Sequence, residues 1–238
     1  MTTTAPSPER KTEVPTDFDR VARRYDFLRT LNPGYKKHLR WSAERMNLGP
    51  TCRVLDLCCG SGLSTEAVLR SYPAAQVTGV DASAGMLEVA RRKPALRRAR
   101  FLLGDAMDPA SVAPGPWDGI LMAYGIRNVP DPDRCLERIR DELAPGGVAC
   151  FHEYSVADSL VARAVWNAVS LGVVIPLGAA ATGSGDLFRY LRHSVNHFDG
   201  AAAFVARLER AGFVDVERHA MDGWQRNVVH SFVARSGS

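Results

Sequence analysis

The segment VLDLCCGSGLST, residues 54–65, places an acid, two adjacent cysteines and two glycines close together. Cysteines can bind a metal or take part in redox exchange, but adjacent cysteines make at best a strained disulfide. Zinc needs two Cys or His pairs at ligand spacing, and the sequence contains no such set. We therefore expect Cys58 and Cys59 to be small packing residues, and we expect no bound metal.

The glycines Gly60 and Gly62 suit a loop whose backbone comes close to a ligand. A dinucleotide-binding loop would need a third small residue at position 65, where the chain has Thr65. Asp56 lies in the apolar run before the loop, outside that fingerprint, and suits a ligand with a positively charged amino group. Asp81 ends the next apolar run, where an acid can bind ribose hydroxyls or cap a helix.

Short apolar runs of strand type alternate with helical stretches through the first two thirds of the chain. Such runs, separated by helices, are typical of parallel strands that are buried on both faces. The predicted strands are 53–58, 76–81, 99–105, 117–124 and 147–155, and the predicted helices are Leu63–Ser71, Ala84–Arg92 and Asp131–Leu143. Ligands bind at the carboxyl ends of strands in such a sheet, which is where the glycine loop and Asp81 fall.

The chain outside these elements divides into three parts. Residues 1–16 are polar and predict a disordered leader, followed by a single domain over residues 17–238. Within that domain, residues 17–47 predict N-terminal helices and residues 156–200 predict a substrate lid made of helices.

Two further strands, over residues 214–221 and 227–235, are expected to close the sheet as an antiparallel pair. The predicted fold class is therefore α/β, a doubly wound, mostly parallel seven-stranded sheet. N-terminal helices and a helical lid insertion accompany this sheet.

The composition is ordinary for a globular protein, with 46% hydrophobic and 24% charged residues. The formal charge of +4 is mild, and we expect no nucleic acid partner. Five cysteines and an N-terminus without an apolar signal indicate a reduced, cytoplasmic setting. Residues 164–183 carry no charge, which leaves core packing, an apolar lid and peripheral contact with a membrane surface open.

Four motifs in order give the chain a resemblance to class I S-adenosylmethionine-dependent methyltransferases. VLDLCCGSG (54–62) resembles their first motif, with Cys58 in place of its first glycine. VTGVDASAGMLEVARRK (77–93), GDAMD (104–108) and LAPGG (143–147) resemble the later motifs. The resemblance implies a Rossmann-like methyltransferase fold and S-adenosylmethionine as cofactor.

The resemblance also implies which residues bind this cofactor. Asp56 would take the amino group of the methionine part, directly or through water, and Asp81 would accept from the ribose hydroxyls. Met86 and Ala106 would flank the adenine, and Asp105 would accept from its amino group. The implied set is Tyr25, Asp56, Cys58, Gly60, Ser61, Gly62, Asp81, Ala82, Met86, Asp105, Ala106 and Ala123.

A closer resemblance is to the ubiquinone/menaquinone C-methyltransferase family. It is carried by FDRVARRYDFLRTLNPGYKKHLRW (18–41), YGIRNVPDPDRCLERIRDELAPGG (124–147) and DLFRYLRHSV (186–195). The resemblance implies C-methylation of a prenylated quinol, or of a similar phenolic or lipophilic acceptor, in menaquinone or ubiquinone biosynthesis.

A quinol carbon becomes nucleophilic when a neighbouring hydroxyl loses its proton. The resemblance implies that Arg127 orients a water or stabilises the phenolate and that Asn128 holds the loop. A structural ion pair of Arg127 is the alternative. The candidate bases are His152, Tyr154, Tyr190, His193 and His197, of which we favour Tyr190 and His197.

Two departures from the family pattern leave the acceptor open. DGWQRNVVHSF (222–232) stands where the family has a Gly-Gly-Ile-Val-Ala-Leu-His type of segment, and Ala123 stands where Ser or Thr is common. The alternatives are a tailoring O- or C-methyltransferase of a small-molecule natural product and a non-catalytic S-adenosylmethionine-binding protein. A homodimer is also left open.

Overall fold

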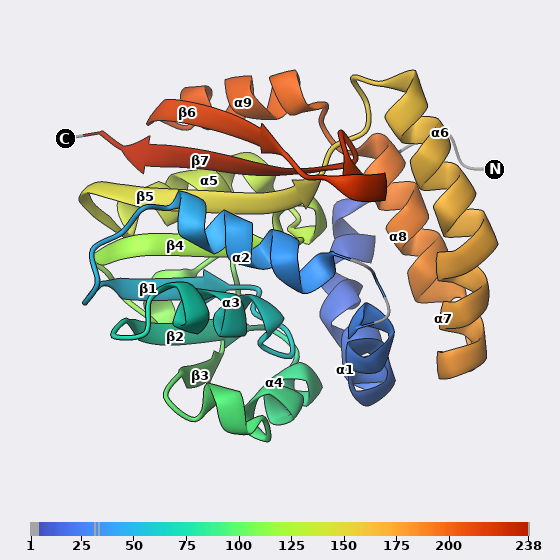
Figure 1. Ribbon diagram of the computed structural model, residues 1–238, viewed down its shortest axis with the longest axis horizontal. Coiled ribbons are helices and arrows are strands. Elements are labelled where there is room, and N and C mark those ends of the chain that lie inside the picture. The colour runs from blue at the N-terminus through green and yellow to red at the C-terminus, as the bar shows by residue number, and fades with distance from the viewer. Residues whose placement is uncertain (1–4, 31, 33, 238) are drawn as a thin grey trace.

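The computed structural model describes the backbone of residues 5–30, 32 and 34–237, and the side chains of these residues except 21 and 23–30. One seven-stranded sheet runs through this part of the chain, in the order β3-β2-β1-β4-β5-β7-β6 (Figure 1). The strands are β1 Arg53–Leu57, β2 Gln76–Asp81, β3 Arg100–Leu103, β4 Trp117–Ala123, β5 Leu143–Tyr154, β6 Phe213–Ala220 and β7 Val229–Ser236. The first five strands pair in parallel, and β7 pairs antiparallel with both β5 and β6.

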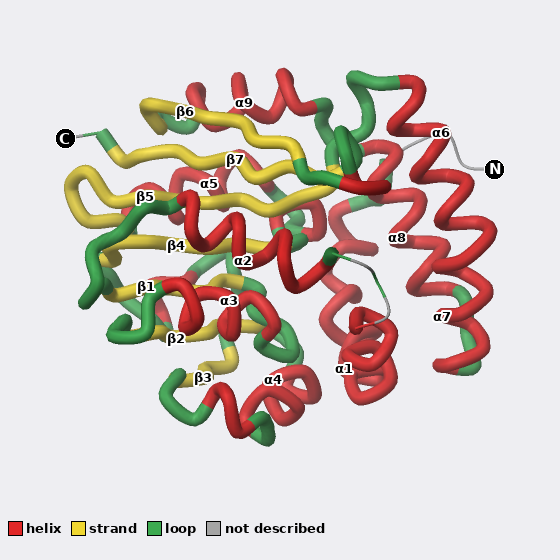
Figure 2. The backbone as a smooth tube through the Cα atoms, viewed as in Figure 1, coloured by secondary structure: helices red, strands yellow, loops and turns green. Residues whose placement is uncertain are grey.

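Helices flank the sheet on both faces and gather past one of its ends (Figure 2). They are α1 Pro8–Thr30, α2 Tyr35–Arg45, α3 Leu63–Ser71, α4 Ala84–Arg91, α5 Pro132–Asp141, α6 Leu160–Val169, α7 Ile175–Thr182, α8 Asp186–His197 and α9 Ala201–Arg210. A π-helical turn, Ser170–Val174, joins α6 directly to α7, and a 3-10 turn, Ile126–Asn128, follows β4.

Two hydrophobic clusters cover the two faces of the sheet. Leu39 of α2 and Val68 of α3 belong to the cluster on one face, and Ile139 of α5 and Phe204 of α9 belong to the cluster on the other. Because both faces are covered, β1 is apolar almost throughout, and its one acid, Asp56, is completely buried. This buried acid lies at the end of the sheet where the site forms.

The predicted fold class is confirmed, down to the antiparallel pair that closes the sheet. The prediction of a disordered leader over residues 1–16 is wrong from Pro8 onward, because α1 begins there. The polar composition and the prolines suggested disorder, but Val14 is buried and the first half of the helix packs over the site. Residues 156–200, which the sequence predicts as a helical lid, form the helices α6, α7 and α8.

Candidate functional site

A cavity of about 410 Å³ opens at the carboxyl ends of β1, β2 and β4, beneath α1. This is the edge where open parallel sheets bind ligands. Its walls come from the glycine loop, the ends of β2 and β4, the turn after β3, and the first turns of α1 and α2. The residues that line it include Lys11, Phe18, Tyr35, Leu39, Cys58, Gly60, Ser61, Ser64, Asp81, Ala82, Met86, Asp105, Ala106, Ala123, Tyr124 and Asn128.

The loop after β1 turns sharply through three residues with left-handed backbone: Cys58 (φ 59°), Gly60 (φ 52°) and Gly62 (φ 84°). A Cβ at Gly60 would meet no heavy atom within 4 Å, so this glycine leaves open space for a ligand beside the backbone. A Cβ at Gly62 would come within 2.4 Å of Leu96 Cδ1, so this glycine is needed for packing. The two glycines thus serve different purposes.

Asp81 is held at the end of β2 by two backbone donors. Its Oδ2 accepts from the N–H of Gly60 at 2.7 Å, and its Oδ1 accepts from the N–H of Ser83 at 2.8 Å. Burial raises the pKa of this carboxyl, and the two N–H donors oppose that rise. The carboxyl faces the cavity with fixed orientation, as binding of ribose hydroxyls would require.

Asp56 lies behind the loop and reaches the cavity through a neighbour. Its Oδ2 accepts hydrogen bonds from Ser64 at 2.8 Å and Thr65 at 2.6 Å, while its Oδ1 has no partner among the described residues. Burial raises its pKa to about 7. Ser64 lines the cavity and Asp56 does not, so contact with a ligand amino group would pass through Ser64 or a water.

The implied adenine residues all line the cavity. Met86 and Ala106 are buried and Ala82 lies beside them, while the exposed Asp105 uses one oxygen to accept from the N–H of Met107 at 2.9 Å. Cys58, Ser61 and Ala123 also line the cavity. The side chain of Tyr25 lies outside the described residues.

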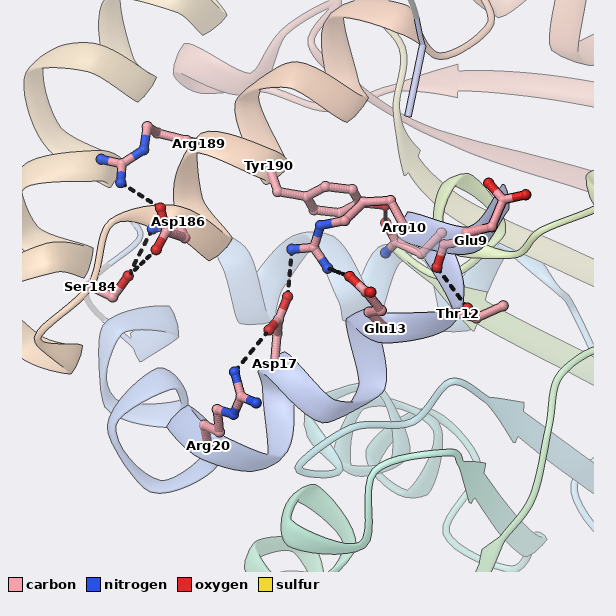
Figure 3. Close-up of polar contacts among 11 residues, drawn as sticks. Glu9, Arg10, Thr12, Glu13, Asp17, Arg20, Ser184, Asp186, Arg189 and Tyr190 are labelled. Carbon is pink, nitrogen blue, oxygen red and sulfur yellow. Dashed lines mark hydrogen bonds and ion pairs between the residues drawn. The ribbon is translucent and has the colours of Figure 1, made fainter. Parts of the chain in front are cut away.

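The helix α1 forms a roof over the cavity that sequence reasoning missed. Lys11 and Phe18 line the cavity, and Lys11 Nζ donates to the carbonyl oxygen of Val129 at 3.0 Å. Farther along, the Asp19 carboxylate accepts from the Gly85 N–H at 2.8 Å. Arg10 pairs with Asp17 at 2.5 Å and covers the ring of Tyr190, which ties α1 to α8 (Figure 3). The apolar spacing that continues N-terminally from Phe18 to Val14 is the signal that could have revealed this part of the helix.

Of the four catalytic candidates, Asn128 lies on the cavity wall and Tyr190 lies directly behind it. Asn128 Oδ1 accepts from the Tyr190 hydroxyl at 3.2 Å, and Asn128 Nδ2 donates to the carbonyl oxygen of Tyr124 at 3.1 Å. These two bonds fix the amide of Asn128 between α8 and the end of β4.

Arg127 and His197 lie elsewhere. Arg127 is 4% exposed, forms an ion pair with the buried Glu153 and donates through Nε to Ser194 of α8 at 3.0 Å. The geometry therefore places Arg127 in the structural ion pair that the sequence left as an alternative. His197 is exposed at the end of α8, where its Nδ1 lies 2.8 Å from the carbonyl oxygen of His193. Neither side chain is among the described residues that line the cavity.

Two solved structures share this fold. The cyclase SpnF is 17% identical with a TM-score of 0.69, covering 98% of this chain and 97% of its own. The phosphoethanolamine N-methyltransferase 2 of Haemonchus contortus is 18% identical with a TM-score of 0.67, covering 98% of this chain and 61% of its own. Because a cyclase and an N-methyltransferase share the architecture, these similarities establish the fold and leave the reaction to other observations.

Similarity in sequence is more specific than similarity in fold, because it identifies the family. The ubiE/COQ5 methyltransferase family matches residues 7–230. The ubiquinone/menaquinone biosynthesis C-methyltransferase UbiE of Methylobacterium nodulans is 32% identical over 227 residues, which is 92% of this chain and 89% of that protein. A demethylmenaquinone methyltransferase of Staphylococcus aureus is 29% identical over 219 residues, 90% of each chain. With the glycine loop, Asp81 and the cavity in their expected places, the chain is a member of the ubiE/COQ5 methyltransferase family and an S-adenosylmethionine-dependent methyltransferase.

Proposed function

We propose that this enzyme methylates a ring carbon of a prenylated quinol or a similar phenolic, lipophilic acceptor. The observation that carries the proposal is the continuity of the cavity. From Asp81 and the glycine loop it continues to Phe18, Tyr35, Leu39 and Tyr124, which are aromatic or apolar. A flat aromatic acceptor suits such walls, since aromatic rings prefer to stack on one another.

On the donor side, the role of the protein residues is to bind and orient S-adenosylmethionine. S-adenosylmethionine brings a methyl group that its sulfonium has already activated. Asp81 would hold the ribose hydroxyls, Met86 and Ala106 would enclose the adenine, and Asp56 would attract the amino group through Ser64. The positive φ of Gly60 and the open space beside it would let the chain pass close beneath the methionine part. These contacts would place the methyl group, and placement is the larger share of such catalysis.

On the acceptor side, Asn128 and Tyr190 are positioning residues. The Asn128 amide lies at the cavity wall and is fixed by the Tyr190 hydroxyl, so it can orient a ring hydroxyl of the acceptor. Arg127 supports the position of Tyr190 indirectly. It donates to Ser194 of α8 and pairs with Glu153 of β5, which ties the helix that carries Tyr190 to the sheet.

The lid supplies an apolar outer surface for the acceptor's tail and for contact with a bilayer. Residues Leu160–Thr182 form a continuous helix, whose most apolar 18-residue stretch has a mean hydropathy of 1.7 and is 17% buried. Leu160, Val161, Leu171, Val173 and Leu177 are exposed, by 84%, 74%, 56%, 49% and 47% respectively. A core helix would bury such residues, so this surface favours peripheral contact with lipid, where a prenylated acceptor resides.

The reaction is tested with labelled S-adenosylmethionine and reduced demethylmenaquinol carrying a short prenyl chain. We expect label on a ring carbon, with a prenyl-free naphthoquinol as a poorer acceptor and with Asp81→Asn strongly impaired. Intact donor binding without transfer to the quinol would overturn the proposal. Transfer to oxygen, or equal use of the prenyl-free ring, would favour a tailoring enzyme instead.

A further inference from the structure

A buried chain of hydrogen bonds begins at the cavity wall and runs into the protein. Tyr124, at the end of β4, lines the cavity, and its hydroxyl lies 2.9 Å from Nε2 of His152 on β5. The two rings meet edge to face, with centroids 4.8 Å apart and planes at 86°. His152 is 0% exposed, so the imidazole is out of contact with solvent.

The bonds behind His152 are compatible with a proton on its Nδ1. His152 Nδ1 lies 2.7 Å from Ser42 Oγ, which donates to the carbonyl oxygen of His38 at 3.2 Å. Ser42 Oγ also lies 2.6 Å from Ser231 Oγ, which accepts from Arg45 Nη1 at 2.9 Å. Ser42 has one hydroxyl hydrogen. When that hydrogen lies on the His38 carbonyl oxygen, Ser42 accepts from both Ser231 and His152 Nδ1–H. Nε2 of His152 is then left to accept from the Tyr124 hydroxyl.

Tyr124 itself is held rigidly. Its backbone adopts φ 59°, a conformation that is uncommon for a residue with a side chain. Its N–H donates to the carbonyl oxygen of His152 at 2.8 Å, and its ring stacks on Tyr35 with centroids 5.6 Å apart and planes at 15°. Such strained positions concentrate at functional sites, where the surrounding structure keeps a group in place.

We propose that Tyr124 and His152 form a proton relay that ionises the phenolic acceptor, an inference that rests on the proposed function. The acceptor O–H bond breaks and its proton passes to the Tyr124 oxygen, while the Tyr124 proton passes to His152 Nε2. This leaves a phenolate and an imidazolium. After the ring carbon has gained the methyl group, it loses its C–H proton to water and the phenolate re-forms. The imidazolium then returns its proton through Tyr124, so one proton is released per turnover.

Two other polar residues near the cavity, Asn128 and Arg127, are less suited to this step. Asn128 is an amide and cannot take up the proton, and Arg127 is a cation already engaged with Glu153. An imidazole whose second nitrogen is oriented by a hydrogen bond is the usual general base in proteins. Ser42 supplies that orientation here and is a positioning residue.

Ionisation is tested without methyl transfer by binding a chromophoric naphthol together with S-adenosylhomocysteine. Absorbance at neutral pH reports whether the bound naphthol is ionised. We expect the wild-type protein to bind the naphtholate, and Tyr124→Phe and His152→Gln to bind the neutral naphthol. Tyr72→Phe, which removes a hydroxyl that donates to the Ala43 carbonyl, and His219→Gln, on exposed β6, are the matched controls. Absence of bound naphtholate on the wild-type protein, or an equal ionised fraction on the variants, overturns the relay.

Turnover measurements distinguish a proton relay through Tyr124 from a merely structural role of this residue. With an ordinary phenolic acceptor, Tyr124→Phe should lower kcat by about 10²–10⁴-fold, the range of general base catalysis, with donor affinity unchanged. With a more acidic, fluorinated acceptor that is already ionised, most of this loss should disappear, and an equal loss for both acceptors contradicts the relay. A wild-type protein that ionises the naphthol but methylates no quinol carbon would retain the relay and overturn the proposed function.

Discussion

Arg127, in the turn after β4, and Glu153, on β5, form an ion pair that is almost completely buried, with side chains 4% and 0% exposed. Burial raises the pKa of Glu153, and the guanidinium of Arg127 opposes this rise. Arg127 also donates to Ser194. The pair therefore fastens the lid helix α8 to the sheet, although the motif containing Arg127 suggested contact with the acceptor.

Removing one partner of this pair should be costly. Arg127→Met leaves Glu153 as an uncompensated buried acid, and we expect a loss of about 3–5 kcal/mol in the free energy of unfolding. Denaturant titration measures this loss, and the double variant Arg127→Met, Glu153→Leu should recover most of it. Arg92→Met, at the exposed pair with Glu88, is the control and should cost less than about 1 kcal/mol. A loss in Arg127→Met no larger than in the control would mean that the pair does not fasten the lid.

Asp81→Asn should weaken S-adenosylmethionine binding by about 1–3 kcal/mol, the cost of leaving a buried polar partner unpaired. The amide cannot accept from the N–H groups of both Gly60 and Ser83 and from the ribose as well. Calorimetric titration gives the affinity. Asp118→Asn is a matched control, since Asp118 also accepts a backbone N–H, that of Arg53, at the opposite end of the sheet. Unchanged affinity in Asp81→Asn would remove Asp81 from the donor site.

Asp56 predicts a pH dependence of stability. Its pKa is about 7 in the folded protein against an ordinary 3.8, so between these values the unfolded chain is ionised while the folded chain keeps its proton. The folded state then binds more protons, and the contribution of Asp56 to stability falls as pH rises from about 4 to 7 and is constant above. Asp56→Asn should remove this slope from denaturation midpoints measured across the range. An identical slope in the variant would show that Asp56 titrates normally.

Two glycines of the loop should respond differently to alanine. Gly62→Ala places a methyl group against Leu96 at a positive φ, and we expect a loss of stability of about 1–3 kcal/mol. Gly60→Ala also has a positive φ but faces open space, so it should cost less stability, and its larger effect should be on S-adenosylmethionine affinity. Thermal unfolding and calorimetry on both variants test the distinction, which fails if the two effects are reversed.

Contact between the lid and lipid should depend on its exposed apolar residues. Leu160→Asp and Leu171→Asp should each reduce binding to phospholipid vesicles several-fold in a sedimentation assay, because a charge must then enter the interface. Val214→Asp, at an exposed apolar position on β6, is the control and should bind as the wild-type protein does. Equal binding by all three variants would place the lipid contact elsewhere.

The sequence by itself determined the strands of the sheet, the position of the glycine loop and the position of Asp81 at the end of β2. These features are local: an apolar run, a turn that needs positive φ and an acid at a strand end are each decided by neighbouring residues, and the parallel order brings their carboxyl ends together. The helix Leu63–Ser71 was predictable for the same reason and matches residue for residue, whereas α1 begins at Pro8, well before the predicted start at residue 17.

Which residues form the acceptor side of the site was decided by tertiary structure alone. Whether Arg127 faces the cavity or Glu153, whether the first half of α1 packs over the cavity, and whether Tyr124 meets His152 depend on contacts between residues far apart in the chain. A buried cation must find its counter-charge and a buried imidazole its hydrogen-bond partners, and packing selects these partners across the sheet. Spacing along the chain carries no record of that selection.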